Sequence, residues 1–414
     1  MTQQITDVLD HPDVDLSWQR EFYQQMHRYP ELSGEEVETA RLIRRQLGLY
    51  DCEVVEGIGG FGMVAIFRNG EGPTALMRAD FDGLPVEETT GSPFASTIKR
   101  PHNGSMVPVM HACGHDMHTT ALLGACATLD ATRGMWSGTF LALFQPAEEI
   151  GAGAARMVED GLGQKIPRPT VCFGQHVVPG PAGQVMSMPG AALAACDSVT
   201  ITIPGRAAHG SMPHLAVDPT YVAAMIVVRL QGIVGREISP EDFAVITVGS
   251  MRAGQSPNTI PASAELKLNT RCYSEEIRAK INAAITRVAI AECQASGTEQ
   301  PNFHWYQHGE LIDNDLKVYR RVRTSFDLVF GEESVDAHRW TASEDFSKIP
   351  VALGAPYVYW TVGATPRNAW NLAQANDRPG DIPVNHMGSF LPDYEPTMAA
   401  ATRAAAAAVL TYLG

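Results

Sequence analysis

The sequence predicts an α/β protein in which a smaller α+β domain is inserted into a larger domain with a mixed sheet flanked by helices. Residues 1–190 alternate between strand-like and helix-like stretches, and this alternation resumes over residues 308–414. Between them, residues 191–307 follow the order strand, helix, strand, strand, helix, which favours a four-stranded, ferredoxin-like sheet. The 414 residues are also too many for one ordinary core and indicate two or three domains.

The first elements of the larger domain carry clear boundary signals. Residues 33–48 are predicted to form a helix, because Ser33 and Glu36 make a capping box and Gly48 is a stop signal. Two apolar stretches then follow over residues 62–68 and 73–79, and the NGEG between them predicts a β-hairpin.

The remaining elements follow from apolar spacing and from turn residues. In the larger domain we expect helices over residues 116–129, 316–330 and 396–413, and strands over residues 138–145, 170–176 and 356–363. In the inserted domain we expect strands over residues 198–205, 243–251 and 262–271, with one helix after Asp218-Pro219 and another over residues 274–296.

Charge and cysteine content exclude several classes of partner. The 31 basic and 46 acidic residues give a formal charge of -15, which argues against nucleic acid and against an anionic membrane surface. No apolar run approaches the roughly 20 residues needed to cross a bilayer, and the polar, acidic N-terminus does not resemble a signal peptide. The seven cysteines are odd in number and without a recurring spacing, so we expect a reducing, cytoplasmic location and no disulfide framework.

Two short segments concentrate the side chains that carry chemistry. Residues 110–120, MHACGHDMHTT, contain three histidines, one cysteine and one aspartate, and the adjacent Glu148 and Glu149 follow a later apolar strand. Thiolate, imidazole and carboxylate groups together suit zinc or manganese, and adjacent glutamates can act as ligand and as base. The segments therefore predict a metal-dependent hydrolase.

Further polar residues follow the ends of predicted strands. Asp80, Asp82 and His176 are placed in this way, as is the glutamate pair, and ligands of α/β sheets gather where strands end in loops. Because Asp80 and Asp82 alternate along the chain, they cannot point the same way. We assign Asp82 to the site, where it would orient a ligand, and give Asp80 a structural role.

These segments, together with several later ones, resemble the dinuclear-metal aminoacylase and carboxypeptidase family in its amidohydrolase branch. That branch includes indole-acetyl-amino-acid hydrolases, hippurate hydrolases and N-acyl-amino-acid aminoacylases. The resemblance runs over nearly the whole chain and rests on MRADFDGLP, MHACGHDMHTT, FQPAEE, GQHVVPG, GRAAHGSMPHLAVDP, SPNTIPASAEL and SEDF. It implies a catalytic α/β domain and an inserted lid domain that dimerises.

The resemblance also implies roles for individual residues. The ligands of two divalent metal ions would be Cys113, His115, Glu149, His176 and His386, and Glu148 would be the general base. His338 is the rival for the last ligand, because the family usually has Ser-Pro or Asp-Pro after this histidine and the chain has Met387-Gly388. Losing that proline should loosen the loop.

In the inserted domain the resemblance singles out three more residues. His209 would reach across a dimer to the scissile carbonyl of the substrate, while Asn258 and Arg271 would hold the substrate carboxylate. An arginine suits this last role because its guanidinium group can bind a carboxylate with two hydrogen bonds.

The expected activity is hydrolysis of the amide bond of a small N-acyl-L-amino acid by a homodimer, with a tetramer as the alternative. Zinc is the expected metal, and manganese and cobalt are the alternatives. A carboxypeptidase that acts on short peptides is the nearest rival, because the same site cleaves either amide. Two other hypotheses are a thiol amidase, with Cys113 activated by His111 or His115, and a non-catalytic binding or scaffold protein.

Overall fold

The computed structural model describes residues 2–414 and divides into two compact units. The larger unit comprises the chain up to Gly190 together with Asp313–His338 and Asp345–Gly414, and the smaller unit comprises Ala191–Ile312 and Arg339–Glu344. Contacts thus assign residues 308–312 and 339–344 to the smaller unit, whereas the sequence places them in the larger domain. None of the helices within residues 2–414 is both long and apolar enough to cross a membrane.

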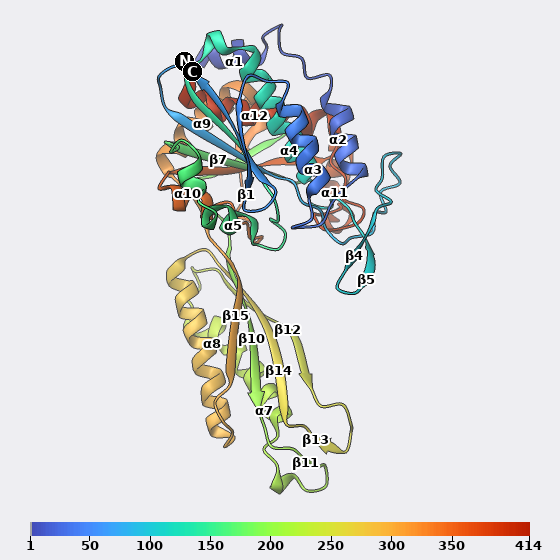
Figure 1. The fold of residues 1–414 in the computed structure, drawn as a ribbon. Helices are drawn as coiled ribbons and strands as arrows, with labels where there is room; N and C mark the ends of the chain where they lie inside the picture. Colours follow the sequence, from blue (N-terminus) through green and yellow to red (C-terminus); the bar gives the residue numbers. More distant parts are fainter. Residues whose placement is uncertain (1) are drawn as a thin grey trace. The chain divides into compact units, whose positions relative to one another are not determined.

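The larger unit is built on an eight-stranded mixed sheet with the order β1-β2-β6-β3-β7-β18-β8-β17 (Figure 1). The strands are β1 (Glu53–Ile58), β2 (Gly62–Asn69), β3 (Thr74–Asp80), β6 (Gly138–Gln145), β7 (Val171–Pro181), β8 (Val185–Ser187), β17 (Ser334–Asp336) and β18 (Tyr357–Thr365). The central strands β3, β6, β7 and β18 run parallel, whereas β2 is antiparallel to β6. This confirms the predicted mixed α/β class.

The predicted hairpin of residues 62–79 is wrong. Both strands form, but β6 lies between them and pairs with β2 on one side and with β3 on the other. The two strands are buried on both faces, as a central position in a sheet requires, and nothing in the local turn sequence reveals a partner about sixty residues later.

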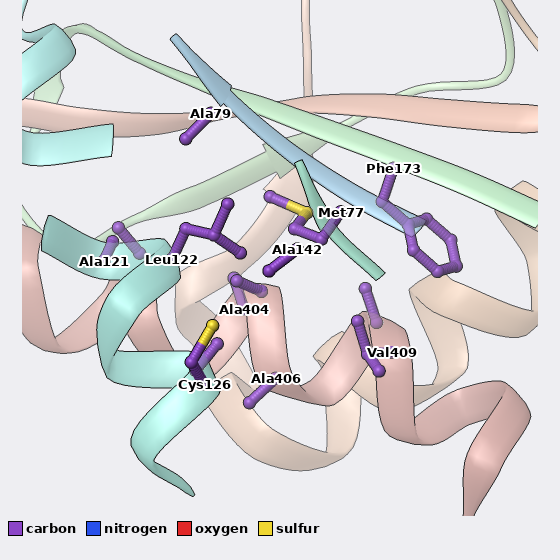
Figure 2. Packing of buried hydrophobic residues seen from close by; sticks show 14 of the residues in the cluster. Met77, Ala79, Ala121, Leu122, Cys126, Ala142, Phe173, Ala404, Ala406 and Val409 are labelled. Atoms are coloured by element: carbon purple, nitrogen blue, oxygen red, sulfur yellow. The ribbon is translucent and has the colours of Figure 1, made fainter. Parts of the chain in front are cut away.

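Helices cover the sheet and build most of the hydrophobic core. The helices of the larger unit are α1 (Thr2–Leu9), α2 (Gln19–Arg28), α3 (Val37–Leu47), α4 (His115–Ala131), α5 (Gly153–Glu159), α6 (Leu162–Lys165), α9 (Leu316–Phe330), α10 (Lys348–Leu353), α11 (Arg367–Ala375) and α12 (Tyr394–Leu413). Figure 2 shows Met77, Ala142 and Phe173 of the sheet packed against Leu122 of α4 and Val409 of α12. The small side chains of α12 allow close helix packing, and Ala404 to Ala408 are fully buried.

Helix α3 differs from its prediction at its start. It begins at Val37 rather than directly after Ser33, and neither Ser33 nor Glu36 makes the hydrogen bonds of a capping box. The amide of Thr39 instead donates to the Glu31 carboxylate at 2.8 Å. Ser33 and Glu36 are therefore available for other contacts.

The smaller unit is a four-stranded antiparallel sheet with two helices. The sheet has the order β12-β14-β10-β15, with β10 (Ala195–Pro204), β12 (Ala244–Ala253), β14 (Ser263–Cys272) and β15 (Asn302–Gly309). The helices α7 (Pro219–Glu237) and α8 (Glu275–Ala295) pack against each other and against the sheet, and they share one apolar core with it (Figure 1). The short strands β11 (Ala208–His209) and β13 (Thr259–Ile260) pair beyond one end of this sheet.

Four short strands complete the chain. They are β4 (Lys99–His102) and β5 (Ser105–Pro108), which form a hairpin, and β9 (Gly190–Leu193) and β16 (Ile312–Asn314).

Candidate metal centre

Three neighbouring strands deliver polar side chains to one edge of the large sheet. Asp80 at the end of β3 lies opposite Gln145 at the end of β6, and Arg78 of β3 lies opposite Gly174 of β7. His176, two residues after Gly174, is therefore level with Asp80. Strand β7 continues to Pro181, so the prediction that this strand ends at His176 is wrong, although the position of the histidine at this edge is as expected.

Gly114 brings Cys113 and His115 to the same edge at the start of α4. Its φ of 83° is left-handed, and a Cβ atom at this position would lie only 2.4 Å from the Val177 side chain. A larger residue would therefore push the segment away from β7. With glycine in place, the Cys113 Sγ lies 3.4 Å from the Nε2 of His176.

The turn after β6 presents both glutamates. Ala147 has a left-handed φ of 53°, which is rare for a residue with a Cβ and reverses the chain just before the pair. The Nε2 of His115 lies 3.9 Å from Glu148 Oε2 and 3.7 Å from Glu149 Oε1. Both carboxylates thus reach one imidazole.

His386 completes the cluster, and its rival His338 lies apart from it. The Nε2 of His386 is 3.3 Å from Glu149 Oε2, and its backbone φ is a left-handed 72°. The His386 amide donates to Ala112 O at 2.8 Å, and the neighbouring Asn385 amide group donates to Val177 O at 3.1 Å. His338 is exposed, and no potential metal-binding group within residues 2–414 includes it.

The arrangement of donor atoms suits two metal ions. Five groups have their donor atoms within 4.8 Å of one another, and three overlapping ones contain only the predicted ligands and Glu148: Cys113, His115 and His176; Cys113, Glu149 and His386; and His115, Glu148 and Glu149. The Nε2 of His115 and the Oε1 of Glu149 are buried without a hydrogen-bond partner. Buried polar atoms normally have partners, so these two atoms fit the role of metal ligands.

The charge around the cluster also favours a cation. Burial disfavours a charged imidazole, but Asp80 and Asp82 outweigh it and raise the pKa of His115 to about 10. Burial, reinforced by the charges of Glu149 and Glu148, raises the pKa of the Cys113 thiol well above its ordinary value. Burial also lowers the pKa of His176, so the Cys113–His176 pair does not form the thiolate–imidazolium couple that a cysteine nucleophile needs.

Asp82 orients the His115 ring. Its Oδ1 lies 3.0 Å from His115 Nδ1, which leaves Nε2 to face the cluster. Its Oδ2 accepts hydrogen bonds from the Ser33 hydroxyl at 2.6 Å and from the Glu149 amide at 3.0 Å. One carboxylate thus links a histidine and a glutamate of the cluster. The role of Ser33 was not foreseen, because the serine also fits a helix cap.

Asp80 has other partners, and these also explain a third histidine of the motif. It lies 2.5 Å from the Arg78 guanidinium and 2.6 Å from Nδ1 of His118. Because the Nε2 of His118 accepts the Val177 amide hydrogen at 2.8 Å, both ring nitrogens of His118 are engaged. His118 therefore supports β7, although donor atoms of His118 and Asp80 also lie within 4.8 Å of His115.

The remaining histidine of the motif, His111, and Asp116 belong to none of the potential metal-binding groups found within residues 2–414. Burial lowers the pKa of His111 to about 4 and keeps it neutral, so His111 is poorly suited to activate a thiol. The Asp116 carboxylate caps the amide of Met117 at 2.9 Å and lies 2.6 Å from Nδ1 of His27.

The three predicted residues of the smaller unit do not converge within one chain. His209 ends β11 and Asn258 directly precedes β13; both are exposed, and Gly210 N donates to Asn258 O at 2.6 Å. Arg271 lies on β14 opposite Cys196, at the other end of the sheet from Ser263. Eight residues of strand separate the two ends, or roughly 26 Å.

The local contacts of His209 and Arg271 show which of their polar atoms already have partners. The Nδ1 of His209 lies 2.7 Å from the Ser211 hydroxyl and 3.2 Å from the Ser211 amide nitrogen, so Nδ1 is engaged locally and the side chain as a whole is exposed. Arg271 donates to Asn269 Oδ1 at 2.9 Å and to the Ser343 hydroxyl within the same unit.

Comparisons with known proteins agree with this geometry. The sequence profile of peptidase family M20/M25/M40 matches residues 76–378. An N-acetyl-L-cysteine deacetylase from Bacillus subtilis is 36% identical over 324 residues, which are 78% of this chain and 75% of that protein. A hippurate hydrolase from Campylobacter jejuni is 36% identical over 78% of this chain and 82% of its own.

A solved structure has the same fold. A dinuclear metal-binding peptidase of the M20 family from Bacillus subtilis has a TM-score of 0.77 at 28% identity, and the match covers 96% of this chain and 98% of that one.

Proposed function

Because the chain belongs to peptidase family M20/M25/M40, we propose that it is an N-acyl-L-amino acid amidohydrolase, which releases a carboxylic acid and a free amino acid. It is a hydrolase of linear amide bonds, as are relatives named as a deacetylase and as a hippurate hydrolase. The observation that carries the proposal is the set of three overlapping donor groups, with Glu148 beside them.

We propose Cys113, His115, Glu149, His176 and His386 as the ligands of two divalent metal ions. When bound, such ions polarise a carbonyl group and lower the pKa of water. Zinc is the proposed metal, because cysteine and histidine together are typical of zinc sites. Manganese and cobalt are the alternatives that elemental analysis would identify.

Glu148 is proposed to move the proton. Its carboxylate accepts a proton from the attacking water, whose oxygen adds to the acyl carbon, and later delivers that proton to the departing nitrogen. Asp82 keeps the His115 ring in place throughout, through the 3.0 Å contact with Nδ1. The balance is one amide and one water consumed, and one acid and one amine formed.

The smaller unit is proposed to bind the substrate within a homodimer. The exposed imidazole of His209 would donate through Nε2 to the developing oxyanion, and Asn258 and Arg271 would supply donors for the substrate carboxylate. One copy of the sheet keeps Arg271 away from the other two residues, so two copies would have to contribute. We also propose a cytoplasmic location, on the basis of the seven cysteines, all of which are free.

The decisive experiment combines elemental analysis of the purified protein with a screen of N-acetyl and N-benzoyl amino acids for released amine. We expect close to two metal ions per chain and amide hydrolysis that EDTA abolishes and that added metal restores. Hydrolysis that survives complete metal removal would support the thiol mechanism instead. Dipeptides in the same screen separate an amidohydrolase from a carboxypeptidase.

A further inference from the structure

The segment Ser33–Glu36 contacts, at two points, the edge of the large sheet where the proposed metal ligands lie. The Ser33 hydroxyl donates to Asp82, and Glu36 is completely buried with its Oε1 2.8 Å from the amide nitrogen of Ala147. A surface helix start has no need to bury a carboxyl group. Both contacts cross from the N-terminal segment to residues around the proposed metal ligands.

Ala147 is the residue at which the chain turns. Its left-handed φ of 53° is unfavourable for a residue with a Cβ, so neighbouring contacts must hold it there. Its carbonyl accepts hydrogen bonds from the amides of Ala152 and Gly153, at 3.3 and 3.0 Å. Its amide hydrogen is accepted by Glu36, so both sides of this residue are engaged.

We infer that Glu36 is a positioning residue for catalysis: its buried carboxyl group accepts the Ala147 amide hydrogen and thereby fixes the turn that presents Glu148 and Glu149. This inference rests on the proposed function, because it concerns how the base and one ligand are held. Glu36 acts through the backbone of the turn and does not touch the substrate.

The Glu36 carboxyl group also interacts with the backbone of Gly34 and of Glu36 itself, but it does not cap the helix that follows. Its Oε2 has no hydrogen-bond partner, and Glu31 binds the helix instead through the Thr39 amide and hydroxyl, at 2.8 and 3.0 Å. Burial, with the nearby Asp82 carboxylate, raises the pKa of Glu36 to about 7. A neutral side chain with an acceptor oxygen should therefore serve at this position.

The test compares two substitutions of similar size. Glu36→Gln keeps an acceptor oxygen for the Ala147 amide, and Glu36→Met removes it. We expect Glu36→Met to lower kcat by roughly 10- to 100-fold, since misplacing a reacting group by about 1 Å costs this much. KM and metal content should stay near wild type, and Glu36→Gln should keep most of the wild-type kcat.

A matched control separates positioning from stability. Glu31→Met removes the other buried carboxylate that binds α3, so it should lower Tm and leave kcat per folded enzyme unchanged. Should Glu36→Met fail to fold, Glu36→Asp gives the same test, because its shorter chain withdraws the acceptor from Ala147.

The outcomes are distinguishable. A wild-type kcat in Glu36→Met, equal losses in the Gln and Met variants, or a loss that merely follows metal content would overturn the inference. Wild-type protein is assayed in parallel, and its failure to hydrolyse any N-acyl amino acid would count against the proposed function itself.

Discussion

Glu148 and Glu149 show how one residue of separation changes the role of a side chain. Both lie within 4 Å of His115 Nε2, but only Glu149 also lies against His386, at 3.3 Å. The backbone of Glu149 is in addition held by Asp82. These contacts fit the proposed roles of Glu149 as a ligand and of Glu148 as the base.

Glu148→Gln should therefore reduce kcat by roughly 10²–10⁴-fold, because the amide cannot accept the proton from water. Metal content and Tm should stay close to wild type, since the five proposed ligands are intact. Steady-state kinetics together with elemental analysis measure both quantities. Near-normal turnover in a fully metal-loaded variant would remove Glu148 from the mechanism.

Cys113→Ala should lower the metal content, because Cys113 belongs to two of the three donor groups. Cys126→Ala is the matched control, since Cys126 is equally buried but lies in the hydrophobic core. We expect the control to keep its metal. Full occupancy in Cys113→Ala with complete loss of activity would instead favour the thiol nucleophile.

The resemblance to the family implied the proposed ligands and the base, but the sequence did not predict the residues that hold them. Ser33 and Glu36 satisfy the capping-box pattern, and nothing local distinguishes a cap from two contacts with distant segments. Likewise, the sequence alone does not distinguish the roles of His111, His115 and His118. Only the hydrogen bonds of the folded chain assign His118 to Asp80 and to the Val177 backbone.

At the scale of elements, local signals predicted where helices and strands lie better than which strands pair. Strand β6 and helix α9 form over the predicted residues. The pairing of β2 and β3 through β6 was missed, because insertion of a strand is a non-local event. That insertion matters for the site, since it places the end of β6 next to the end of β3.

The loop that carries His386 is the element in which this sequence departs from the resembling family. A proline is absent, but Thr89 N donates to Gly388 O at 2.7 Å, and a Cβ at Gly388 would lie 2.1 Å from the backbone oxygen of Glu87. In this chain the contact of Gly388 with the backbone of Glu87 and Thr89 thus holds the loop, whereas in the family a proline would restrict it. The glycine is required for this approach.

Gly388→Ala should therefore destabilise the protein by about 1–3 kcal/mol, because a backbone atom cannot move aside as a side chain can. We also expect weaker metal retention on dialysis, since His386 lies two residues away. Gly380→Ala is the control, as open space surrounds that position. Equal Tm and metal retention in both variants would show that the loop tolerates the extra atom.

At the scale of the whole molecule, the smaller unit carries three of the residues proposed to bind the substrate. Its sheet keeps His209 and Asn258 at one end and Arg271 at the other. The β10–β14 register makes this separation a property of one folded unit. The sequence predicts a strand over residues 262–271 that ends at Arg271, but it does not predict that β11 pairs with β13, which places His209 next to Asn258.

A mixing experiment tests whether His209 acts in the active site of a partner subunit. His209→Ala and Glu148→Gln should each be inactive alone, since loss of an oxyanion donor costs roughly 10²–10³ in kcat. If His209 acts across the dimer, each mixed dimer has one site with both defects and one with neither. Random exchange should then restore about a quarter of wild-type activity, because half of the dimers are mixed and each has one intact site. If His209 acts within its own chain, every site keeps one defect and mixing restores nothing. Differently tagged subunits confirm that exchange occurred, so inactive mixed dimers, or a fully active monomer, would refute the cross-subunit role.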